Sequence, residues 1–137
     1  MEWTRNEYRI TDDARKANLD VIHRLLATSY WAATRSRETI QKTIENSLCF
    51  SLYHNDEQIG FARVVTDFAT IAWLGDVIID PAYRGQGLGK WLVETIVSDE
   101  RLKSLALILS TRDAHTLYAQ YGFRKDPDKL MWRPRPQ

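Results

Sequence analysis

The sequence has little cysteine, proline or glycine, and no excess charge of either sign. A single cysteine cannot form an internal disulfide, which excludes a small disulfide-stapled secreted scaffold and favours a reducing compartment. Nineteen basic and eighteen acidic residues leave a net charge of +1, so the composition indicates no polyanion partner. No apolar run approaches the ~18 residues of a membrane span, and the first residues lack an apolar signal core. We therefore expect a cytoplasmic protein that binds neither nucleic acid nor membrane.

The 137 residues match the size of one domain, and no repeat or Gly/Ser/Pro-rich linker divides them, so we expect a single domain over 1–137. Hydrophobic periodicity predicts the elements in turn. These are helices at 19–29 (capped by Asn18) and 37–45, a strand hairpin at 48–53 and 59–65, a strand at 71–79, a helix at 88–99, a strand buried on both faces at 105–109, a helix from an Asp113 cap to Tyr121, and closing strands at Phe123 and 130–132.

This order predicts an α/β (α+β) domain built on a single mixed sheet. The early strands follow one another as hairpins without crossover helices, which makes the sheet mostly antiparallel. A doubly wound dinucleotide-binding fold is excluded for the same reason, since it requires a helix between successive parallel strands.

Half of the six glycines lie within five positions, as Gly85, Gly87 and Gly89 between the long strand and its helix. Glycine permits backbone conformations that other residues avoid, and it lets a ligand approach the backbone closely. The amides of a first helical turn attract anions, and Arg84 and Lys90 add positive charge at both ends of this segment. The cluster therefore predicts a phosphate or pyrophosphate site, against the alternative of a merely tight turn.

The cluster fits neither of the two commonest phosphate motifs. A P-loop requires glycine five positions before its Gly-Lys pair and Ser or Thr after it, but here those places hold Arg84 and Trp91. The dinucleotide fingerprint requires a third glycine three residues after the second, and Lys90 stands there. A different phosphate-binding family is therefore indicated.

Arg84, Gly87 and Gly89 do resemble the Arg/Gln-x-x-Gly-x-Gly/Ala pyrophosphate loop of the GNAT N-acetyltransferase superfamily. A second segment, at 114–123, is similar to the family's closing Ala-x-x-Leu-Tyr-x-x-x-Gly-Phe pattern. The spacing between the two leaves room for one helix and one strand, as in that family, and the order of elements agrees over nearly the whole chain. The chain is thus identified as a suspected member of this superfamily.

The resemblance implies an acetyl-CoA-dependent acyltransferase that moves acetyl directly to a primary amine of a small molecule or peptide. In this fold the strand before the loop splays from its parallel neighbour, and the pantetheine arm of acetyl-CoA pairs with the exposed backbone. By resemblance, Val77, Ile78 and Ile79 line that slot, while Arg84, Gly85, Gln86, Gly87, Leu88, Gly89 and Lys90 hold the pyrophosphate.

The family usually supplies a tyrosine as general acid for the leaving thiolate, and Tyr118 stands at the matching place. The alternative is an aromatic side chain that only packs beneath its helix. Asp76 is the candidate base, through a water relay, or else a structural carboxylate bound to a basic neighbour. Glu38, Asp67 and His115 are weaker candidates for the base.

Other positions are assigned to ligand contact by resemblance. Thr111 stands where the family often carries an Asn that contacts coenzyme A, and His115 borders the same region. Tyr30 and Trp31 fall in a connection that walls the acceptor pocket, with Arg35 and Arg37 beyond, where a carboxylate could bind. A packed helix joint with solvated arginines is the alternative. No His/Cys spacing suggests a metal.

Two functional alternatives accompany this interpretation, a protein-lysine acetyltransferase and a non-catalytic acyl-CoA sensor. An open, acidic acceptor groove would favour the former, and a closed aromatic pocket would favour small amines. Dimers are common in the family, so the resemblance allows a homodimer, although no feature of the sequence itself indicates one.

Overall fold

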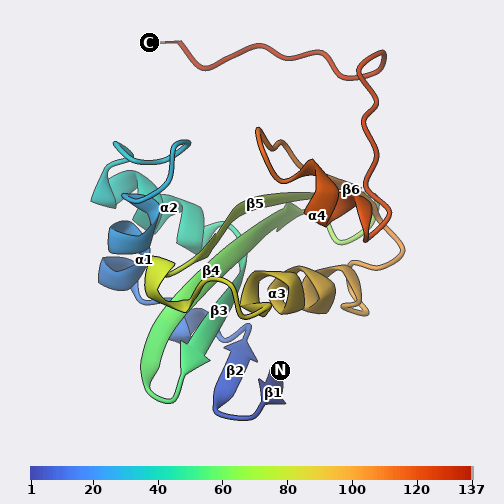
Figure 1. The fold of residues 1–137 in the computed structure, drawn as a ribbon. Helices are drawn as coiled ribbons and strands as arrows, with labels where there is room; N and C mark the ends of the chain where they lie inside the picture. Colours follow the sequence, from blue (N-terminus) through green and yellow to red (C-terminus); the bar gives the residue numbers. More distant parts are fainter. Residues whose placement is uncertain (137) are drawn as a thin grey trace.

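In a computed structural model that describes residues 1–136, six strands form one sheet with four α-helices around it (Figure 1). The strands are β1 (Glu2–Arg5), β2 (Tyr8–Thr11), β3 (Leu48–His54), β4 (Glu57–Thr66), β5 (Ile71–Ile79) and β6 (Ala106–Ile108). The helices are α1 (Leu19–Leu26), α2 (Arg37–Glu45), α3 (Leu88–Val97) and α4 (His115–Ala119), with 3₁₀ turns at Ala14–Lys16 and Pro81–Tyr83. No helix among residues 1–136 is long and apolar enough to cross a membrane.

The sheet has the order β1-β2-β3-β4-β5-β6, and every pair is antiparallel except β5 with β6. That parallel pair is short, because it joins only Ile71–Trp73 of β5 to Ala106–Ile108 of β6. The rest of β5 continues without a strand on that side among the described residues. The mixed, mostly antiparallel sheet with a splayed parallel pair is the predicted fold class.

Helices cover both faces of the sheet. On one face, Ile22 of α1 and Ile40 of α2 are fully buried and pack in one cluster with Phe61 of β4. On the other face, Leu92 of α3 is fully buried in a larger cluster with Val64 of β4. The apolar periodicity of each helix thus matches the sheet face that it covers.

Side-chain caps define where the first two helices begin. Asn18 accepts a hydrogen bond from the amide of Val21 at 3.1 Å, and Ser36 accepts one from that of Thr39 at 3.1 Å. These bonds satisfy amides that the first turn of a helix leaves without partners. Both starts agree with the predictions, and α2 has the predicted bounds, whereas α1 ends three residues before the expected Ser29.

A bulge in β5 determines where its side chains point. Phe61 of β4 pairs with Ile78, yet Arg63 pairs with Gly75, so β5 contains one more residue than β4 between these pairs. The extra residue is accommodated at Asp76, whose φ of 54° is unusual for a residue other than glycine. The bulge brings the Asp76 side chain to the face on which Arg63 lies, where the two form an ion pair.

The chain ends contain the elements that were predicted wrongly. The β1–β2 hairpin was not expected, although Asn6 with its φ of 56° stands at its two-residue turn, where asparagine tolerates the left-handed region. The expected closing strands at Phe123 and 130–132 are absent from residues 1–136. Leu130, Met131 and Trp132 are exposed instead, and the segment after Phe123 runs away from the sheet (Figure 1).

Because no further strand covers β6, this strand is a half-exposed edge of three residues, and the prediction of a strand buried on both faces at 105–109 is wrong. The start of the last helix also differs. Asp113 makes no cap, since the hydroxyl of Thr111 accepts the hydrogen bond from the amide of Ala114 at 3.0 Å. Gly122 follows the helix with φ of 88°, the left-handed conformation that commonly ends helices.

Candidate active site

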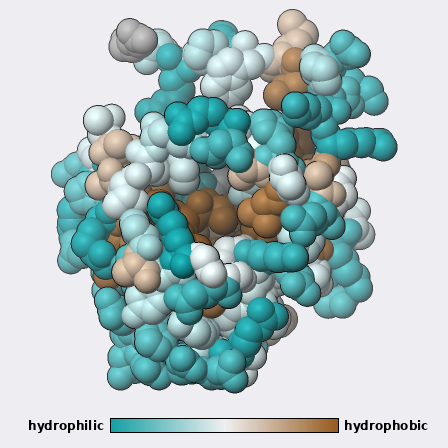
Figure 2. Space-filling view, in the orientation of Figure 1, coloured by the Kyte–Doolittle hydropathy of each residue, from teal (hydrophilic) through white to brown (hydrophobic). Residues whose placement is uncertain are grey.

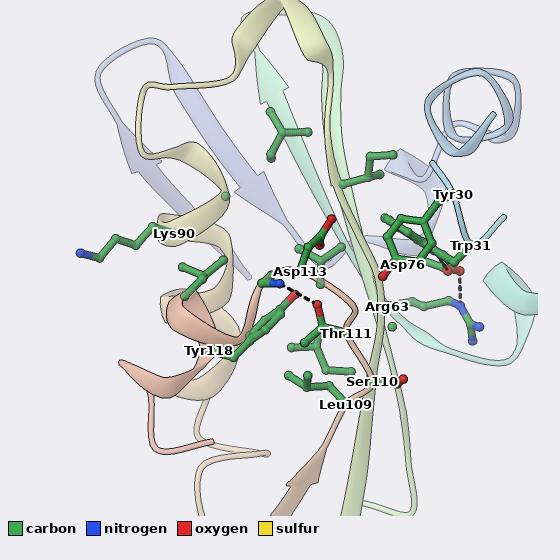
Figure 3. Close-up of a pocket in the computed structure, with 18 of the residues that line it drawn as sticks. Tyr30, Trp31, Arg63, Asp76, Lys90, Leu109, Ser110, Thr111, Asp113 and Tyr118 are labelled. Carbon is green, nitrogen blue, oxygen red and sulfur yellow. Dashed lines mark hydrogen bonds and ion pairs between the residues drawn. The ribbon is translucent and has the colours of Figure 1, made fainter. Parts of the chain in front are cut away.

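A cavity of about 740 Å³ runs between the glycine loop (residues 84–90) and the connection between α1 and α2. Its walls come from β5, the glycine loop, residues 109–118 and the α1–α2 connection. Figure 2 shows apolar residues at the bottom of a hollow whose borders are hydrophilic. Segments far apart in the sequence therefore meet at one site, which the close-up in Figure 3 displays.

One wall of this cavity is formed by the part of β5 that does not pair with β6. The pairing between β5 and β6 ends at Trp73 and Ile108, so the β5 backbone beyond that point has no strand partner on that side among residues 1–136. Val77, Ile78 and Ile79 belong to this open stretch and line the cavity. Unpaired strand groups accept an incoming extended chain, which makes this wall suited to an extended amide-bearing ligand.

The glycine loop forms the adjoining end of the cavity. Gly85 and Gly87 have φ of 83° and 78°, and a Cβ added at either would meet no atom within 4 Å. Conformation rather than crowding therefore requires glycine there, and the space in front of the loop is open. Gly87 is also the N-cap of α3 without a side-chain cap, which leaves the first amides of this helix free for an anion.

Two cations border the loop. Arg84 donates from Nε to the carbonyl of Ile79 at 3.3 Å, and Lys90 lies in the first turn of α3 (Figure 3). Both residues line the cavity. The loop thus offers backbone donors, a positive helix end and two positive side chains, a donor set that fits a pyrophosphate.

Tyr118 lies across the cavity from β5, on α4 (Figure 3). Its ring packs edge-on against Phe123 with centroids 5.8 Å apart, and its hydroxyl forms no hydrogen bond with another residue of the described chain. Burial, with smaller contributions from Tyr30 and Asp113, raises the pKa of Tyr118 to about 12. The phenol is therefore protonated at neutral pH and can donate a hydrogen bond or a proton into the cavity.

A buried ion cluster occupies the other side of β5. The carboxylate of Asp76 accepts from Arg63 Nε at 2.6 Å, from Arg35 Nη1 at 2.7 Å and from Trp31 Nε1 at 2.9 Å (Figure 3). Burial alone would raise the pKa of Asp76, but the hydrogen bonds and charges of Arg63 and Arg35 hold it below its ordinary value. The carboxylate is a weak proton acceptor here, and this geometry favours the structural alternative over the base.

Tyr30, which lines the cavity, contacts Arg112 and Trp31. Its hydroxyl accepts a hydrogen bond from the amide of Arg112 at 3.0 Å, and the Arg112 guanidinium lies 3.7 Å from the centre of its ring. Tyr30 also contacts Trp31 edge-on, with ring centroids 5.2 Å apart. These contacts join the α1–α2 connection to a segment 82 positions further along the chain.

The structure brings nearly all of the predicted site residues to this cavity. Exceptions are Gln86, which bonds the Tyr8 hydroxyl and the Tyr83 carbonyl outside it, and His115, which is exposed at the start of α4. The cavity is lined by the predicted residues Tyr30, Trp31, Asp76, Val77, Ile78, Ile79, Arg84, Gly85, Gly87, Leu88, Gly89, Lys90, Thr111 and Tyr118.

The weaker candidates for the base lie elsewhere. Asp67 accepts hydrogen bonds from the amides of its own turn, and Glu38 is exposed on α2. Arg37 pairs with Asp20 on the surface rather than reaching the cavity. Arg63 is a cavity residue that the prediction missed, and its signal was the one charged side chain in the apolar stretch at 59–65.

The comparisons with known proteins agree with this geometry. A family model described as an acetyltransferase (GNAT) domain matches residues 45–125. A solved structure assigned as a GNAT-family acetyltransferase from Xanthomonas campestris pv. campestris is 38% identical, with a TM-score of 0.89 and 94% of each chain covered. The uncharacterized N-acetyltransferase ycf52 of Gracilaria tenuistipitata var. liui is 32% identical over 85% of this chain and 69% of its own length.

A more distant structure shares the fold alone. N-acetylglutamate synthase from Neisseria gonorrhoeae, complexed with coenzyme A and N-acetyl-glutamate, is 21% identical with a TM-score of 0.73, over 90% of this chain and 30% of its own. The chain spans from 32% to 76% of the length of eight curated relatives that it matches. Because the family model covers more than half of the chain and agrees with the fold, the chain belongs to the GNAT family of acetyltransferases.

Proposed function

We propose that the protein transfers acetyl from acetyl-CoA to a primary amine of a small molecule, with residues 1–137 as one catalytic domain. The observation that carries this proposal is that the Tyr118 hydroxyl, free of protein partners in residues 1–136, faces the same cavity as the glycine loop. The loop binds the pyrophosphate through its amides, Arg84 and Lys90. The open backbone at 77–79 holds the pantetheine arm, and Thr111 offers a further contact beside it.

The chain's role in the reaction follows from these positions. A neutral amine attacks the thioester carbonyl, a C–N bond forms and the C–S bond breaks. Tyr118 is protonated at neutral pH because burial raises its pKa to about 12; it gives its proton to the departing sulfur and then takes up, through cavity water, the proton that the amine releases. The amine releases its proton to water in the cavity. Asp76 is not the acceptor of that proton, because its oxygens already bind Arg63, Arg35 and Trp31; we assign it a positioning role.

A small acceptor is favoured over a protein lysine by the charge of the acceptor side. Trp31, Arg35 and Arg63 line this part of the cavity, and Asp76 beside them is already paired with the two arginines. A basic peptide segment would be favoured by a negative wall, whereas these arginines are positive. We further propose that the protein acts in the cytoplasm, because a chain with a single cysteine suits a reducing compartment.

Replacing Tyr118 by Phe tests the proposal against a non-catalytic acyl-CoA sensor. We expect kcat for thiol release with an amine panel to fall about a hundredfold, the usual contribution of a general acid, with the Kd for acetyl-CoA nearly unchanged. Tyr121→Phe is the matched control, because Tyr121 does not line the cavity and donates only to the Lys90 carbonyl at 3.4 Å.

Equal activity of the wild-type protein and Tyr118→Phe would remove Tyr118 as the acid. Acetyl-CoA binding without thiol release for any amine would favour the sensor. Acetylation of protein lysines in preference to every small amine would favour the protein-lysine enzyme.

A further inference from the structure

Two arginines from distant parts of the chain converge on the acceptor side of the cavity. Arg35 belongs to the α1–α2 connection and Arg63 to β4, and both line the cavity. Their side chains are only 16% and 15% exposed, so each guanidinium has lost most of its water. Charges held this way normally have close partners.

The cluster of Asp76, Arg35 and Arg63 carries more positive than negative charge. Within residues 1–136, Asp76 is the one carboxylate that pairs with the two arginines, and it neutralises one of them. Asp113, also on the cavity, pairs instead with Arg112 at 3.5 Å. One net positive charge therefore stays on the wall, largely buried, next to the space that an acceptor would occupy.

The arginines also retain unused donors. Arg63 donates hydrogen bonds from Nε to Asp76 and from Nη1 to Ser47 at 3.3 Å, while Arg35 donates one from Nη1 to Asp76. Arg63 Nη2, and Nε and Nη2 of Arg35, have no hydrogen-bond partner within residues 1–136. These nitrogens retain some access to solvent, because they are not among the fully buried unpaired atoms of the described chain.

The charge balance selects one kind of partner. A carboxylate brings a single negative charge and planar oxygens that match guanidinium donors, which would bring the site to neutrality. A phosphate would bring up to two negative charges and would leave an excess of negative charge at this largely buried site. Trp31, fixed by its bond to Asp76, and Trp73 add apolar surface beside the arginines.

We infer that the acetyl acceptor is an amine that carries a carboxylate, which Arg35 and Arg63 bind while the amine reaches toward the Tyr118 side of β5. Figure 3 shows Arg63 and Asp76 on one side of this strand and Tyr118 on the other, within one cavity. This inference rests on the proposed function, because it names the substrate class of the same site.

The test compares acceptors that differ only in the carboxylate. L-Phenylalanine, 3-amino-3-phenylpropanoate and 4-aminobutanoate are each assayed beside their methyl esters, with acetyl-CoA and thiol detection. We expect kcat/KM to be at least about tenfold higher for one or more acids than for its ester. In Arg35→Gln the ratio of kcat/KM for the acid to kcat/KM for its ester falls to less than about twofold.

Arg37→Gln is the matched control, because this arginine pairs with Asp20 on the surface outside the cavity. We expect Arg37→Gln to keep the wild-type ratio of kcat/KM for the acid to kcat/KM for its ester. Arg35→Gln leaves Arg63 on Asp76, so the buried carboxylate keeps a partner; thermal unfolding checks that the variant folds.

Direct binding separates failure of this inference from failure of the proposed function. In the wild-type protein, calorimetry at low salt compares 3-phenylpropanoate with 3-phenylpropanamide, neither of which contains an amine. Tighter binding of the acid supports the anion site even if no amine in the panel is acetylated. Esters acetylated as well as acids, or equal binding of the acid and the amide, would overturn the inference while the acetyltransferase proposal stands.

Discussion

The two ends of the cavity are built by different means. The end formed by residues 77–90 offers backbone: unpaired strand groups, glycines at positive φ and the first amides of α3. The opposite end offers side chains, namely Trp31, Arg35 and Arg63 held on one buried carboxylate, Asp76. Backbone recognition suits a ligand shared by a whole family, whereas a side-chain cluster can differ between relatives and select the acceptor.

A charged side chain in the glycine loop should have the largest effect. In Gly87→Glu, the carboxylate enters the open space before the loop at a φ of 78° that strains any other residue. We expect acetyl-CoA affinity to fall about a thousandfold, roughly 4 kcal/mol, by calorimetry. Gly89→Ala is the control, since its Cβ would meet Ile79 at an ordinary 3.6 Å. Similar losses of acetyl-CoA affinity in Gly87→Glu and Gly89→Ala would contradict the view that backbone groups form this end of the cavity.

Removing the central carboxylate should damage the side-chain end and leave the glycine loop intact. Asp76→Asn leaves two poorly hydrated guanidiniums without their anion, because the Asp76 side chain is 4% exposed. We expect the free energy of unfolding to drop by about 3 kcal/mol in urea titrations. Asp20→Asn breaks an exposed pair with Arg37 and should cost no more than about 0.5 kcal/mol. Unchanged stability of Asp76→Asn would mean that the cluster is not an ion pair network.

The same variant has a pH dependence with a defined sign. Because folding depresses the pKa of Asp76, its contribution is present at pH values above the unfolded pKa of 3.8. It is lost as the pH falls through the lower, folded-state pKa. The stability difference between the wild-type protein and Asp76→Asn should be constant between about pH 6 and 8 and shrink below about pH 4. A difference that grows on acidification would show that Asp76 is not held as a charged group.

This comparison also explains what could be predicted from the sequence. The glycine loop and the segment around Tyr118 are local patterns, so Gly85, Gly87 and Tyr118 could be assigned to one site without a structure. The helix α2 was predicted with its bounds, and α1 was predicted with its start and its Asn18 cap. These features can be predicted because each depends on residues that are neighbours in the sequence.

The acceptor end depends on contacts between residues 13 to 45 positions apart. The bulge at Asp76 decides which face that carboxylate reaches, and a shift of one residue in strand register is not visible in composition or periodicity. The side chain of Asp76 was therefore considered as a base, and Arg63 was overlooked. The closing strands were expected at 130–132 because those residues are apolar, but apolar character alone does not supply a pairing partner.

The smallest effect that still distinguishes the two ends is expected from the Trp31 indole. Trp31→Phe keeps an aromatic surface but removes the hydrogen bond from Nε1 to the Asp76 carboxylate, a bond to a charged group worth about 1.5 kcal/mol. We expect KM for the amine to rise about fivefold and the Kd for acetyl-CoA to stay within about twofold. Trp132→Phe is the control at the cavity rim, where no hydrogen bond of the indole is formed within residues 1–136, and it should change neither constant. If Trp31→Phe weakened acetyl-CoA binding instead of acceptor binding, the division of the cavity into a backbone end and a side-chain end would be wrong, because the indole would then belong to the acetyl-CoA side.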